Sequence, residues 1–516
     1  MTGRHPYTPE GFDAMTWELA CAAIDRAIKD AVRAATSDPC FHGSPEQGYW
    51  FALDHARDVP HQPDLVPEDL RPAMVHYRLP PVTRARASTT PAVVEDYRGD
   101  PVHTFDPWGA PSGAGFHPQG FYARWADAIE EAFTDWDRLP DERDFWAAAR
   151  EQRDAVRALA EVTEHAGLLF DLQWSLGVPG SSVHPDSAGP PPPMTGRAVE
   201  ALTTRYVIPL EGTLVQQAWL AELVAAELDG LGDMWQCARR GVMDLGALAT
   251  QVLRGQGTVE DRLDAISMWS TILSFVGLVP SLGPAAGLAS VALLGVQGAL
   301  EDMAEKRFPL EKEISVALSE ASSSTIVHKI HAALQEVRNY ITLEEGTAQG
   351  TIDIALGWSY QEPLIDPPDS YRTTFNLPGP EVVAASDPAE FVGPDEVAVD
   401  FPRLRRAGGH LSAIGDRVGD AAASWTALPP DNAIWLRPDR VGGVGRDGPF
   451  DAWKALRDRV GWLLSDTSGE LIDAGDHVAL AANALESADD EARAELRQHA
   501  EAVADVRSPD PAEPPP

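Results

Sequence analysis

The side chains best suited to hold a metal are one cysteine and three histidines in a Pro/His/Asp-rich stretch near the N-terminus. Cys40, His42, His55 and His61 lie close in sequence to Asp54 and offer the thiolate and imidazole groups that zinc prefers. Their spacing lacks the tight ligand pairs of short structural zinc sites. We therefore expect scattered loop histidines and no metal, with a metal site as the less favoured alternative.

Sequence motifs for catalysis are also sparse. The run GGVGRDG at residues 442–448 is rich in glycine and precedes a helical pattern, but the Lys-Ser/Thr pair of a phosphate cradle does not follow it. We expect it to be a turn between helices. The chain has no HExxH, no GxSxG and no P-loop, and no GxGxxG opens a helix after a strand. We accordingly expect no enzyme, no catalytic residue and no cofactor.

The most distinctive feature is an uncharged apolar run at residues 265–300, bracketed by Asp264 and Glu301. Pro280 and Pro284 interrupt it, so the run favours two short helices folded into a hairpin over one continuous helix. Each arm would have about 15 residues and a length of roughly 22 Å. That is shorter than the roughly 20 residues that usually cross a hydrocarbon core.

Two interpretations of this apolar hairpin remain open. A hairpin that is apolar on all sides can form the buried centre of a helical bundle, and we favour this interpretation for the resting state. Alternatively, the hairpin contacts lipid. For the second case we predict a membrane-insertion element whose key residues are Trp269, Phe275, Val276, Pro280, Pro284 and Leu293.

Charge and cysteine content restrict the remaining classes of protein. The chain has 79 acidic and 41 basic residues and a formal net charge of −38, so it would repel nucleic acid. Its three cysteines cannot form a disulfide framework. The first residues show no basic segment followed by an apolar core, so we expect no cleavable signal peptide.

Hydrophobic periodicity predicts a mostly α-helical, multidomain protein with only minor β segments. The expected parts are an N-terminal Trp-rich helical and irregular domain (1–176), a Pro-rich linker (177–196), a helical domain that contains the apolar hairpin (197–360), an acidic Pro-rich linker (361–396), a C-terminal helical hairpin (397–505) and a disordered tail (506–516). Short strands are possible at residues 73–79 and 92–97. Asp141 should cap a helix, and Gly230 and Gly232 should interrupt another.

Two apolar seams at three- and four-residue steps predict the C-terminal hairpin. The first runs from Leu404 to Trp425 and the second from Trp453 to Ala488, and their alanine-rich faces favour a close approach of two antiparallel helices. Leu411, Ile414, Val460, Leu463 and Val478 should face across the seam. Asp416, Arg457 and Glu486 should remain in solvent.

The same segment resembles the EspC-like family associated with type VII (ESX) secretion, whose members are relatives of WXG-type helical hairpins. The residues that carry the resemblance are VDFPRLRRAGGHLSAIGDRVGDAAASW, GPFDAWKAL and LIDAGDHVALAANALESADDEARAEL. Family members often have an aromatic-x-x-x-acid export element after the second helix, and here the corresponding residues are Leu485 and Asp489. The resemblance implies a partner or export surface that includes Trp425, Trp453, Leu485 and Asp489.

In layout alone, the long amphipathic helices on both sides of the apolar run resemble those of helical pore-forming toxins. The two resemblances together imply a non-enzymatic protein linked to type VII secretion in actinobacteria, an effector or virulence protein with a membrane-active hairpin. Such a protein would be secreted or surface-bound without a signal peptide, and would interact with secretion components or a helical-hairpin partner. The alternative is a cytoplasmic scaffold or chaperone that binds secretion partners through its C-terminal hairpin.

Overall fold

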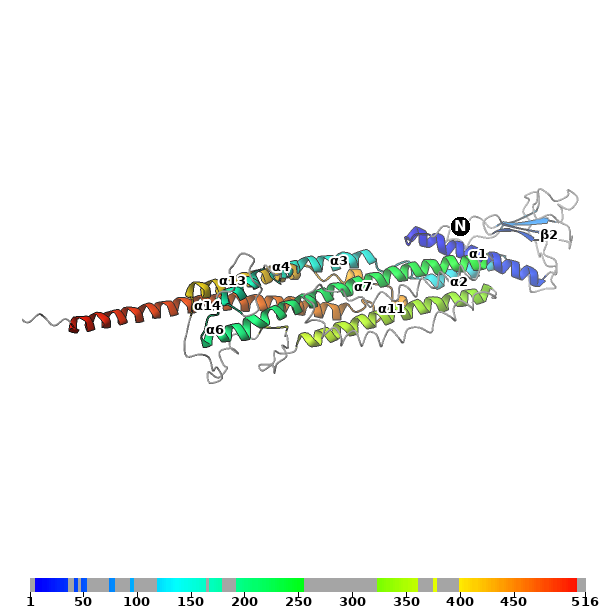
Figure 1. Cartoon of the computed structure of the whole chain (residues 1–516). Helices are drawn as coiled ribbons and strands as arrows, with labels where there is room; N and C mark the ends of the chain where they lie inside the picture. The colour runs from blue at the N-terminus through cyan, green and yellow to red at the C-terminus, as the bar shows by residue number, and fades with distance from the viewer. Residues whose placement is uncertain are drawn as a thin grey trace, which may run out of the picture.

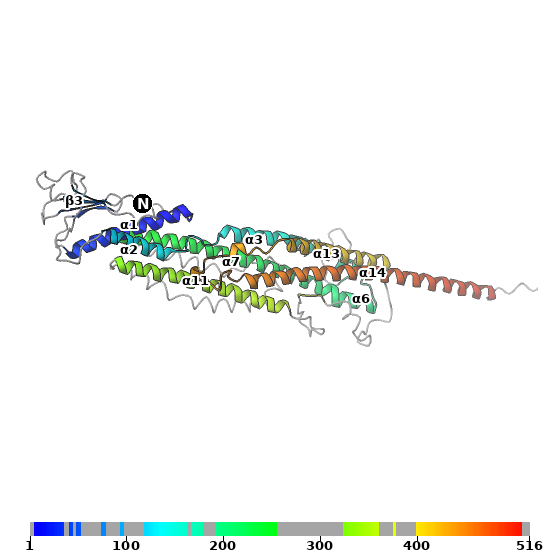
Figure 2. The same ribbon diagram turned by 180° about the vertical axis from the view of Figure 1, so that it is seen from behind.

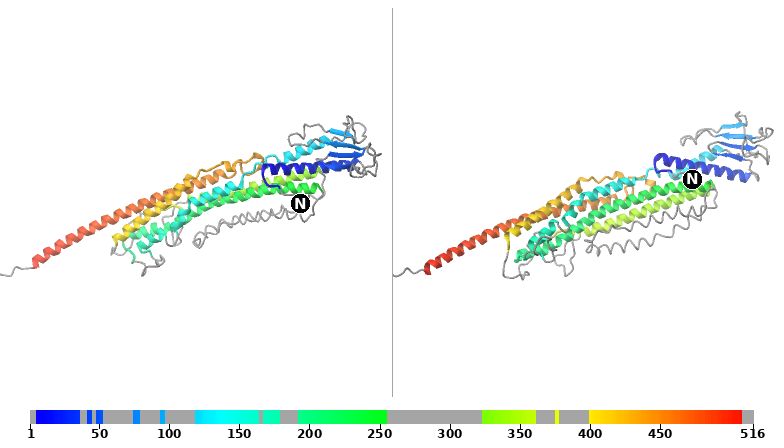
Figure 3. Two further views of the ribbon diagram at one scale, coloured as in Figure 1. Left: turned by 90° about the horizontal axis from the view of Figure 1, so that it is seen from above. Right: turned by 45° about the horizontal axis from the view of Figure 1, so that its top comes forward.

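The chain folds into an elongated rod of long helices (Figure 1). The computed structural model describes residues 5–35, 41–44, 48–52, 74–78, 93–96, 118–163, 167–178, 192–254, 323–360, 375–377 and 399–507. A small sheet lies at one end of the rod, and the last helix extends alone beyond the other end (Figures 2 and 3). The prediction of a mostly α-helical fold is confirmed.

The N-terminal part consists of one long helix followed by a four-stranded antiparallel sheet. Helix α1 (Pro9–Ala35) precedes strands β1 (Phe41–Ser44), β2 (Gly48–Ala52), β3 (Met74–Arg78) and β4 (Val93–Asp96), which pair in chain order. In the register, Phe41 lies opposite Phe51, Tyr49 opposite Tyr77, and Val75 opposite Asp96. Strands β3 and β4 fall in the two stretches for which short strands were predicted.

The chain continues with helices α2 (Pro118–Phe133) and α3 (Glu142–Ala155). Trp125, Ile129 and Trp136 are buried, as expected for the apolar face of α2 and the turn after it. Asp141 caps α3, since its carboxylate accepts a hydrogen bond from the amide of Arg143 at 3.0 Å. The short helices α4 (Arg157–Thr163) and α5 (Leu168–Leu176) complete this part.

The longest helix of the central part runs without a break from α6 (Arg197–Leu202) through a π-helical turn, η3 (Thr203–Val207), into α7 (Ile208–Leu253). Pro209 lies in the first turn of α7, where its missing amide hydrogen explains a local widening of the hydrogen-bond ladder. The predicted interruption at Gly230 and Gly232 is wrong. A Cβ at Gly232 would lie 2.6 Å from Nε1 of Trp146, so this glycine makes room for α3 and does not end the helix.

Helix α11 (Ser323–Ser359) packs against α7 in the antiparallel direction. The rings of Trp219 and Trp358 lie 6.5 Å apart, while Arg437 stacks on Trp235 of α7 and binds Glu345 of α11. These contacts show that the two helices run in opposite directions, since a later position on α7 lies beside an earlier position on α11. Consequently the end of α7 and the start of α11 lie at the same end of the rod, next to α1.

The predicted C-terminal helical hairpin is present. Helix α13 (Phe401–Ala427) and the long helix α14 (Phe450–Arg507) are joined by a loop with two 3-10 turns, η7 (Ala433–Trp435) and η8 (Asp439–Val441). A Cβ at Gly408 would lie 2.7 Å from the carbonyl oxygen of Gly475, and one at Gly415 would lie 2.7 Å from Ile472. The helices therefore approach so closely that only glycine fits at these crossings.

One hydrophobic core runs through the described helices of all three predicted domains. Helix α13 packs on α3, α4 and α5, while α14 packs on α7 and α11. The indole nitrogen of Trp453 donates to the carbonyl oxygen of Val224 at 3.0 Å, and Gln217 donates to Thr467 at 2.7 Å. The domain boundaries stay predictions, but the ranges that they separate share one core.

The apolar run at residues 265–300 lies outside the described residues. The structure therefore gives no position for its predicted insertion residues, which are Trp269, Phe275, Val276, Pro280, Pro284 and Leu293. Of the helices in the described ranges, none is both long enough and apolar enough to cross a bilayer.

Candidate functional site

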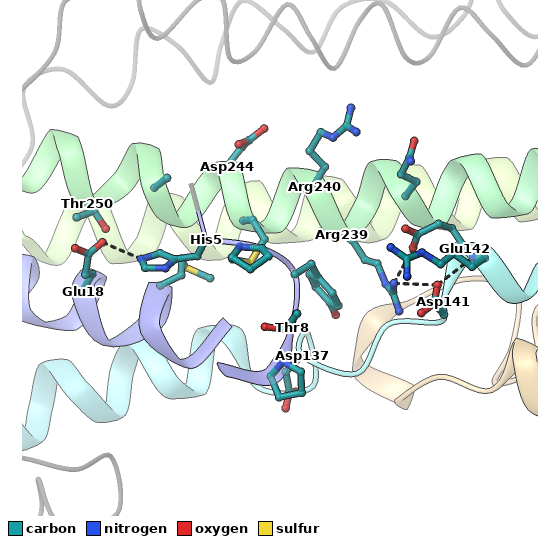
Figure 4. Close-up of a pocket in the computed structure, with 18 residues that line it drawn as sticks. His5, Thr8, Glu18, Asp137, Asp141, Glu142, Arg239, Arg240, Asp244 and Thr250 are labelled. Carbon is teal, nitrogen blue, oxygen red and sulfur yellow. Dashed lines mark hydrogen bonds and ion pairs between the residues drawn. The ribbon is translucent and has the colours of Figure 1, made fainter. Parts of the chain in front are cut away.

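A cleft of about 730 Å³, with several charged side chains in its lining, lies at the end of the rod where α1 meets α7 (Figure 4). The N-terminal segment, residues 5–8, crosses this cleft, and the turn between α2 and α3 closes one side. In Figure 4, Arg239 points toward Glu142 and Asp141, whereas Arg240 and Asp244 point away on the other side of α7. The charged groups of the cleft thus come from segments far apart in the sequence.

Arg239 connects α7 to the start of α3. Its guanidinium donates to the carboxylate of Glu142 at 2.7 Å and to the carbonyl oxygen of Leu139 at 2.9 Å. It also lies 3.4 Å from Asp141 and 4.8 Å from the ring centroid of Tyr7. A guanidinium that stacks on a ring and binds a carboxylate at the same time orients both elements firmly.

Tyr7 ties the N-terminal segment to the same turn. Its hydroxyl accepts a hydrogen bond from the amide of Leu139 at 3.1 Å and donates one to the carbonyl oxygen of Trp136. Burial raises the pKa of the Tyr7 hydroxyl well above its usual value. The phenol therefore stays neutral and serves as a structural hydrogen-bonding group.

Glu18 of α1 links the N-terminal segment to the end of α7. One carboxylate oxygen lies 3.4 Å from Nε2 of His5, and the other lies 3.7 Å from the guanidinium of Arg254. Arg254 is the last described residue before the segment that contains the apolar run. Glu18 with its partners His5 and Arg254, which we call the clasp, therefore joins the N-terminal segment and α1 to the residue that follows α7.

A second polar centre lies in the middle of the rod, where Arg437 binds Glu345 with two parallel hydrogen bonds. Both side chains are 1% exposed. Burial raises the pKa of Glu345, although the Arg437 charge and the amide of Val444 at 3.0 Å act in the opposite direction. The pair joins α11 to the loop of the C-terminal hairpin.

The glycine run at residues 442–448 forms the wall around this ion pair. Gly443 has a φ of +102° and Gly448 a φ of +56°, values that favour glycine. A Cβ at Gly443 would collide with Arg437, and one at Gly448 would lie 2.8 Å from Glu345. Arg437 also donates to the carbonyl oxygens of Gly442 and Gly445. The predicted interhelical turn is therefore present, and it encloses a buried charge pair.

A further carboxylate with a shifted pKa is Glu227 of α7, whose side chain is partly buried. Burial raises its pKa to about 8, and the negative charge of Glu344 on α11 contributes in the same direction. The contact between α7 and α11 thus brings Glu227 within reach of the charge of Glu344, whose side chain is 5% exposed.

Two of the four predicted partner or export residues are core residues. Trp425 is 0% exposed and donates to the carbonyl oxygen of Arg457 at 2.9 Å. Trp453 is 3% exposed and stacks within 5.6 Å of Trp435 and 6.2 Å of Phe450. In this structure both indoles hold the hairpin and the rod together.

The other two predicted partner residues lie on the surface. Leu485 is 49% exposed, and Asp489 forms an i,i+4 ion pair with Arg493 at 2.7 Å. Leu485 lies beside the first turns of α13, where Arg405 contacts Asn483 and Glu486, and Asp489 follows one turn further toward the free end of α14. The structure thus separates the predicted set of four into an internal pair and an external pair.

The seam predictions for the C-terminal hairpin are confirmed for the apolar positions and for Asp416. Leu411, Ile414, Val460 and Leu463 are 0% exposed, and Val478 is partly buried. Asp416 is exposed, and Glu486 is half-buried and pairs with Arg405. Arg457 is 4% exposed, so its predicted exposure is wrong.

The reason for the burial of Arg457 is that it caps α13. Its guanidinium donates to the carbonyl oxygens of Trp425 at 2.8 Å and of Leu428, which the helix end leaves without partners. Burial lowers the pKa of this guanidinium. A periodicity count cannot find such a cap, because the capping residue lies 32 positions from Trp425 along the chain.

Sequence reasoning missed both polar centres. Nothing near Arg239, Glu345 or Arg437 in the sequence distinguishes them from solvated charges, since their partners lie far along the chain. The closely spaced glycines at residues 442–448 were a usable signal, because several glycines in a short loop indicate a close approach to another group. Nothing in the sequence named the group that approaches.

Comparison with known proteins gives no relative to set beside this geometry. No family model matches the chain, and no curated protein or solved structure shows a significant match. Within the described ranges, no group of three or more His, Cys, Asp or Glu side chains converges as a metal site would require. Cys40, His55 and His61 lie outside the described residues, as does the side chain of His42.

Proposed function

We propose that this chain is a non-catalytic membrane-acting protein of the helical pore-forming type, in which the apolar run at residues 265–300 inserts into a lipid bilayer. The observation that carries the proposal is the antiparallel packing of α7 and α11. This packing places Leu253 and Ser323, which flank residues 254–322, at one end of the rod.

Three features of that end support the proposal. The two helices that flank the segment are long, with 46 and 37 residues, and their inner faces are buried against other helices. The two helices therefore form a rigid support for the proposed insertion of residues 265–300 into a bilayer. The uncharged run is the longest in the chain, and a charge-free run of 36 residues is enough for two short membrane-embedded arms. The His5–Glu18–Arg254 clasp holds the attachment point.

The test is dye release from liposomes by the full-length protein. Val276→Asp and Leu293→Asp should abolish release, because a charge at the bilayer centre costs about 2.5–3.5 kcal/mol. The matched control is Leu480→Asp, which adds the same charge at a position on α14 that is 65% exposed and should leave release unchanged. Circular dichroism must first show that each variant keeps its helix content.

Acidity should act on this release through surface charge. Protonation of surface carboxylates lowers the repulsion between a chain of net charge −38 and anionic lipid. Glu227, whose pKa is raised to about 8, titrates above the acidic range and therefore does not contribute to this pH dependence. If the folded wild-type protein releases no dye between about pH 4 and pH 7.5, the membrane proposal is wrong.

A second candidate function is binding of a secretion partner through the C-terminal hairpin, which is the type VII role that the family resemblance implies. The observation that favours it is the exposure of Leu485 and Asp489 on the free end of α14. Deletion of residues 485–507 should then keep the protein inside the producing cells. Unchanged extracellular levels of the deletion variant would exclude this role and leave the C-terminal hairpin with an interaction role unrelated to secretion.

A further inference from the structure

Helix α14 is much longer than the helix that it packs against. Arg405, near the start of α13, contacts Asn483 at 2.8 Å and Glu486. Ala482 is the last buried residue of α14 among those with described side chains. From there to residue 501, every side chain is exposed or only partly buried, and the helix projects alone from the rod (Figures 1 and 3).

The stripe that faces α13 does not stop where α13 ends. Leu471, Gly475 and Ala482 are buried on this stripe, and Val478 is partly buried. Steps of four and three residues then lead to an exposed continuation, which we call the terminal seam: Leu485, Asp489, Ala492, Leu496 and His499. Leu485 is 49% exposed and Leu496 is 68% exposed. A heptad stripe of this kind packs against another helix, and the end of the rod supplies none among the described residues.

Charge is distributed unevenly along this exposed part. Its first half is purely acidic, with Glu486, Asp489, Asp490 and Glu491. Its second half is mixed, with Arg493, Arg497 and His499 beside the acids Glu495 and Glu501. Parallel pairing of two such helices would place acid against acid. Antiparallel pairing places the acidic half of one helix beside the half of the other that contains the bases, so the charge pattern selects a second copy in the opposite direction.

The seam also fixes the register of such a pair. In an antiparallel coiled coil the two alternating seam positions face each other. If Ala492 lies opposite Leu496 of the other copy, then Asp489 lies opposite His499. A twofold axis repeats both contacts, so each seam residue from 489 to 499 meets a complementary neighbour. The small Ala492 leaves room for the large Leu496.

We infer that the terminal seam is a self-association surface on which a second copy of this chain docks antiparallel, joining two rods at their α14 ends. Such a dimer is closed and does not grow into a ring or a filament, because the same patch is used on both copies. The inference does not depend on the proposed membrane function, since the seam lies at the opposite end of the rod from Leu253 and Ser323.

Analytical ultracentrifugation of the full-length protein tests the inference. The wild-type chain should sediment as a dimer at micromolar concentrations, and Leu496→Asp should weaken the dimer by on the order of tenfold or more. Leu480→Asp is the matched control, because Leu480 is 65% exposed on the other side of the same helix. A wild-type monomer at all accessible concentrations overturns the inference, as does equal loss in both variants. A monomer that pairs only with an added foreign amphipathic helix assigns the seam to a different partner.

A charge swap tests the register. His499→Glu places two acids together at each of two symmetric contacts and should weaken the dimer, whereas Asp489→Lys combined with His499→Glu should restore it. Rescue by the double variant supports the register, because neither residue contacts the other within one copy. If the double variant is weaker than both single variants, the register is wrong.

Engineered cysteines test the direction. Protein with Ala492→Cys, mixed with protein carrying Leu496→Cys, should form a disulfide-linked mixed dimer. Leu485→Cys alone should form no self-linked dimer, since antiparallel pairing separates the two copies of position 485 by more than 20 Å at 1.5 Å per residue. Efficient linkage of Leu485→Cys to itself would show parallel pairing and refute the proposal.

Discussion

The buried ion pair between Arg437 and Glu345 makes a sharp prediction about stability. Glu345→Gln keeps the shape of the side chain and removes its charge, so the Arg437 guanidinium remains 1% exposed without a counter-ion. Gly442, Gly443 and Gly448 crowd the pair so closely that the guanidinium cannot move to solvent without displacing the loop. The charge is therefore trapped in the core.

The expected loss of stability is large when one partner of the ion pair is replaced and small when both are replaced. Breaking a buried pair by removing one partner costs about 3–5 kcal/mol, because an uncompensated charge stays buried. Replacing both partners with apolar residues of similar volume is often neutral or stabilising by about 1–4 kcal/mol. We therefore expect Glu345→Gln to lower the free energy of unfolding by about 3–5 kcal/mol. Glu345→Leu combined with Arg437→Met should lower it by far less.

Urea unfolding followed by circular dichroism measures this difference. The control is Asp154→Asn, which breaks an ion pair with Arg157 whose side chains are 52% and 74% exposed, and which should change stability by less than about 0.5 kcal/mol. A loss below about 1 kcal/mol for Glu345→Gln, or a double variant as unstable as the single one, would refute the account of Arg437 as a trapped charge.

Three further predictions concern stability. Gly415→Ala in α13 should destabilise the protein by about 1–3 kcal/mol in urea unfolding because α14 leaves no room for a methyl group, whereas Gly409→Ala, with open space around it, should be neutral or stabilising. Trp453→Phe should cost about 1–2 kcal/mol in the same assay, because its bond to the Val224 carbonyl is lost. The raised pKa of Glu227, about 8 against 4.5 in the unfolded chain, should make stability fall as the pH rises between these values, and pH-dependent unfolding of Glu227→Gln should show a flatter decline.

Local patterns in the sequence predicted the helices well. The seams of α13 and α14 and the cap at Asp141 depend on neighbours within a few residues, and the structure confirms them. The apolar positions of α11, from Ile326 to Ile341, are buried as their period indicates. The glycine pair in α7 was misinterpreted because a glycine that fits a crossing helix and one that breaks a helix look alike in sequence.

The polar centres and the shared core could not be predicted in the same way. Arg437 and Glu345 are 92 positions apart, and Arg239 and Glu142 are 97 apart. No short-range pattern connects such residues. Trp453 was predicted to begin a seam and to belong to a partner surface, whereas its hydrogen bond to α7 depends on a helix 229 positions earlier. These contacts follow from how the rod is assembled, which no single window of sequence contains.

The shared core also determines the order in which the chain can mature. Val224 of α7 forms its hydrogen bond with Trp453, which is synthesised 229 residues later. Gln217 of α7 forms its hydrogen bond with Thr467, which is synthesised 250 residues later. Until then the apolar face of α7 has no cover from α14, and contacts of such large sequence separation form slowly. The nascent chain therefore exposes a long apolar helix for much of its synthesis. A truncated product that lacks the last hundred residues would retain that exposed face and should be a substrate for holding chaperones or proteases.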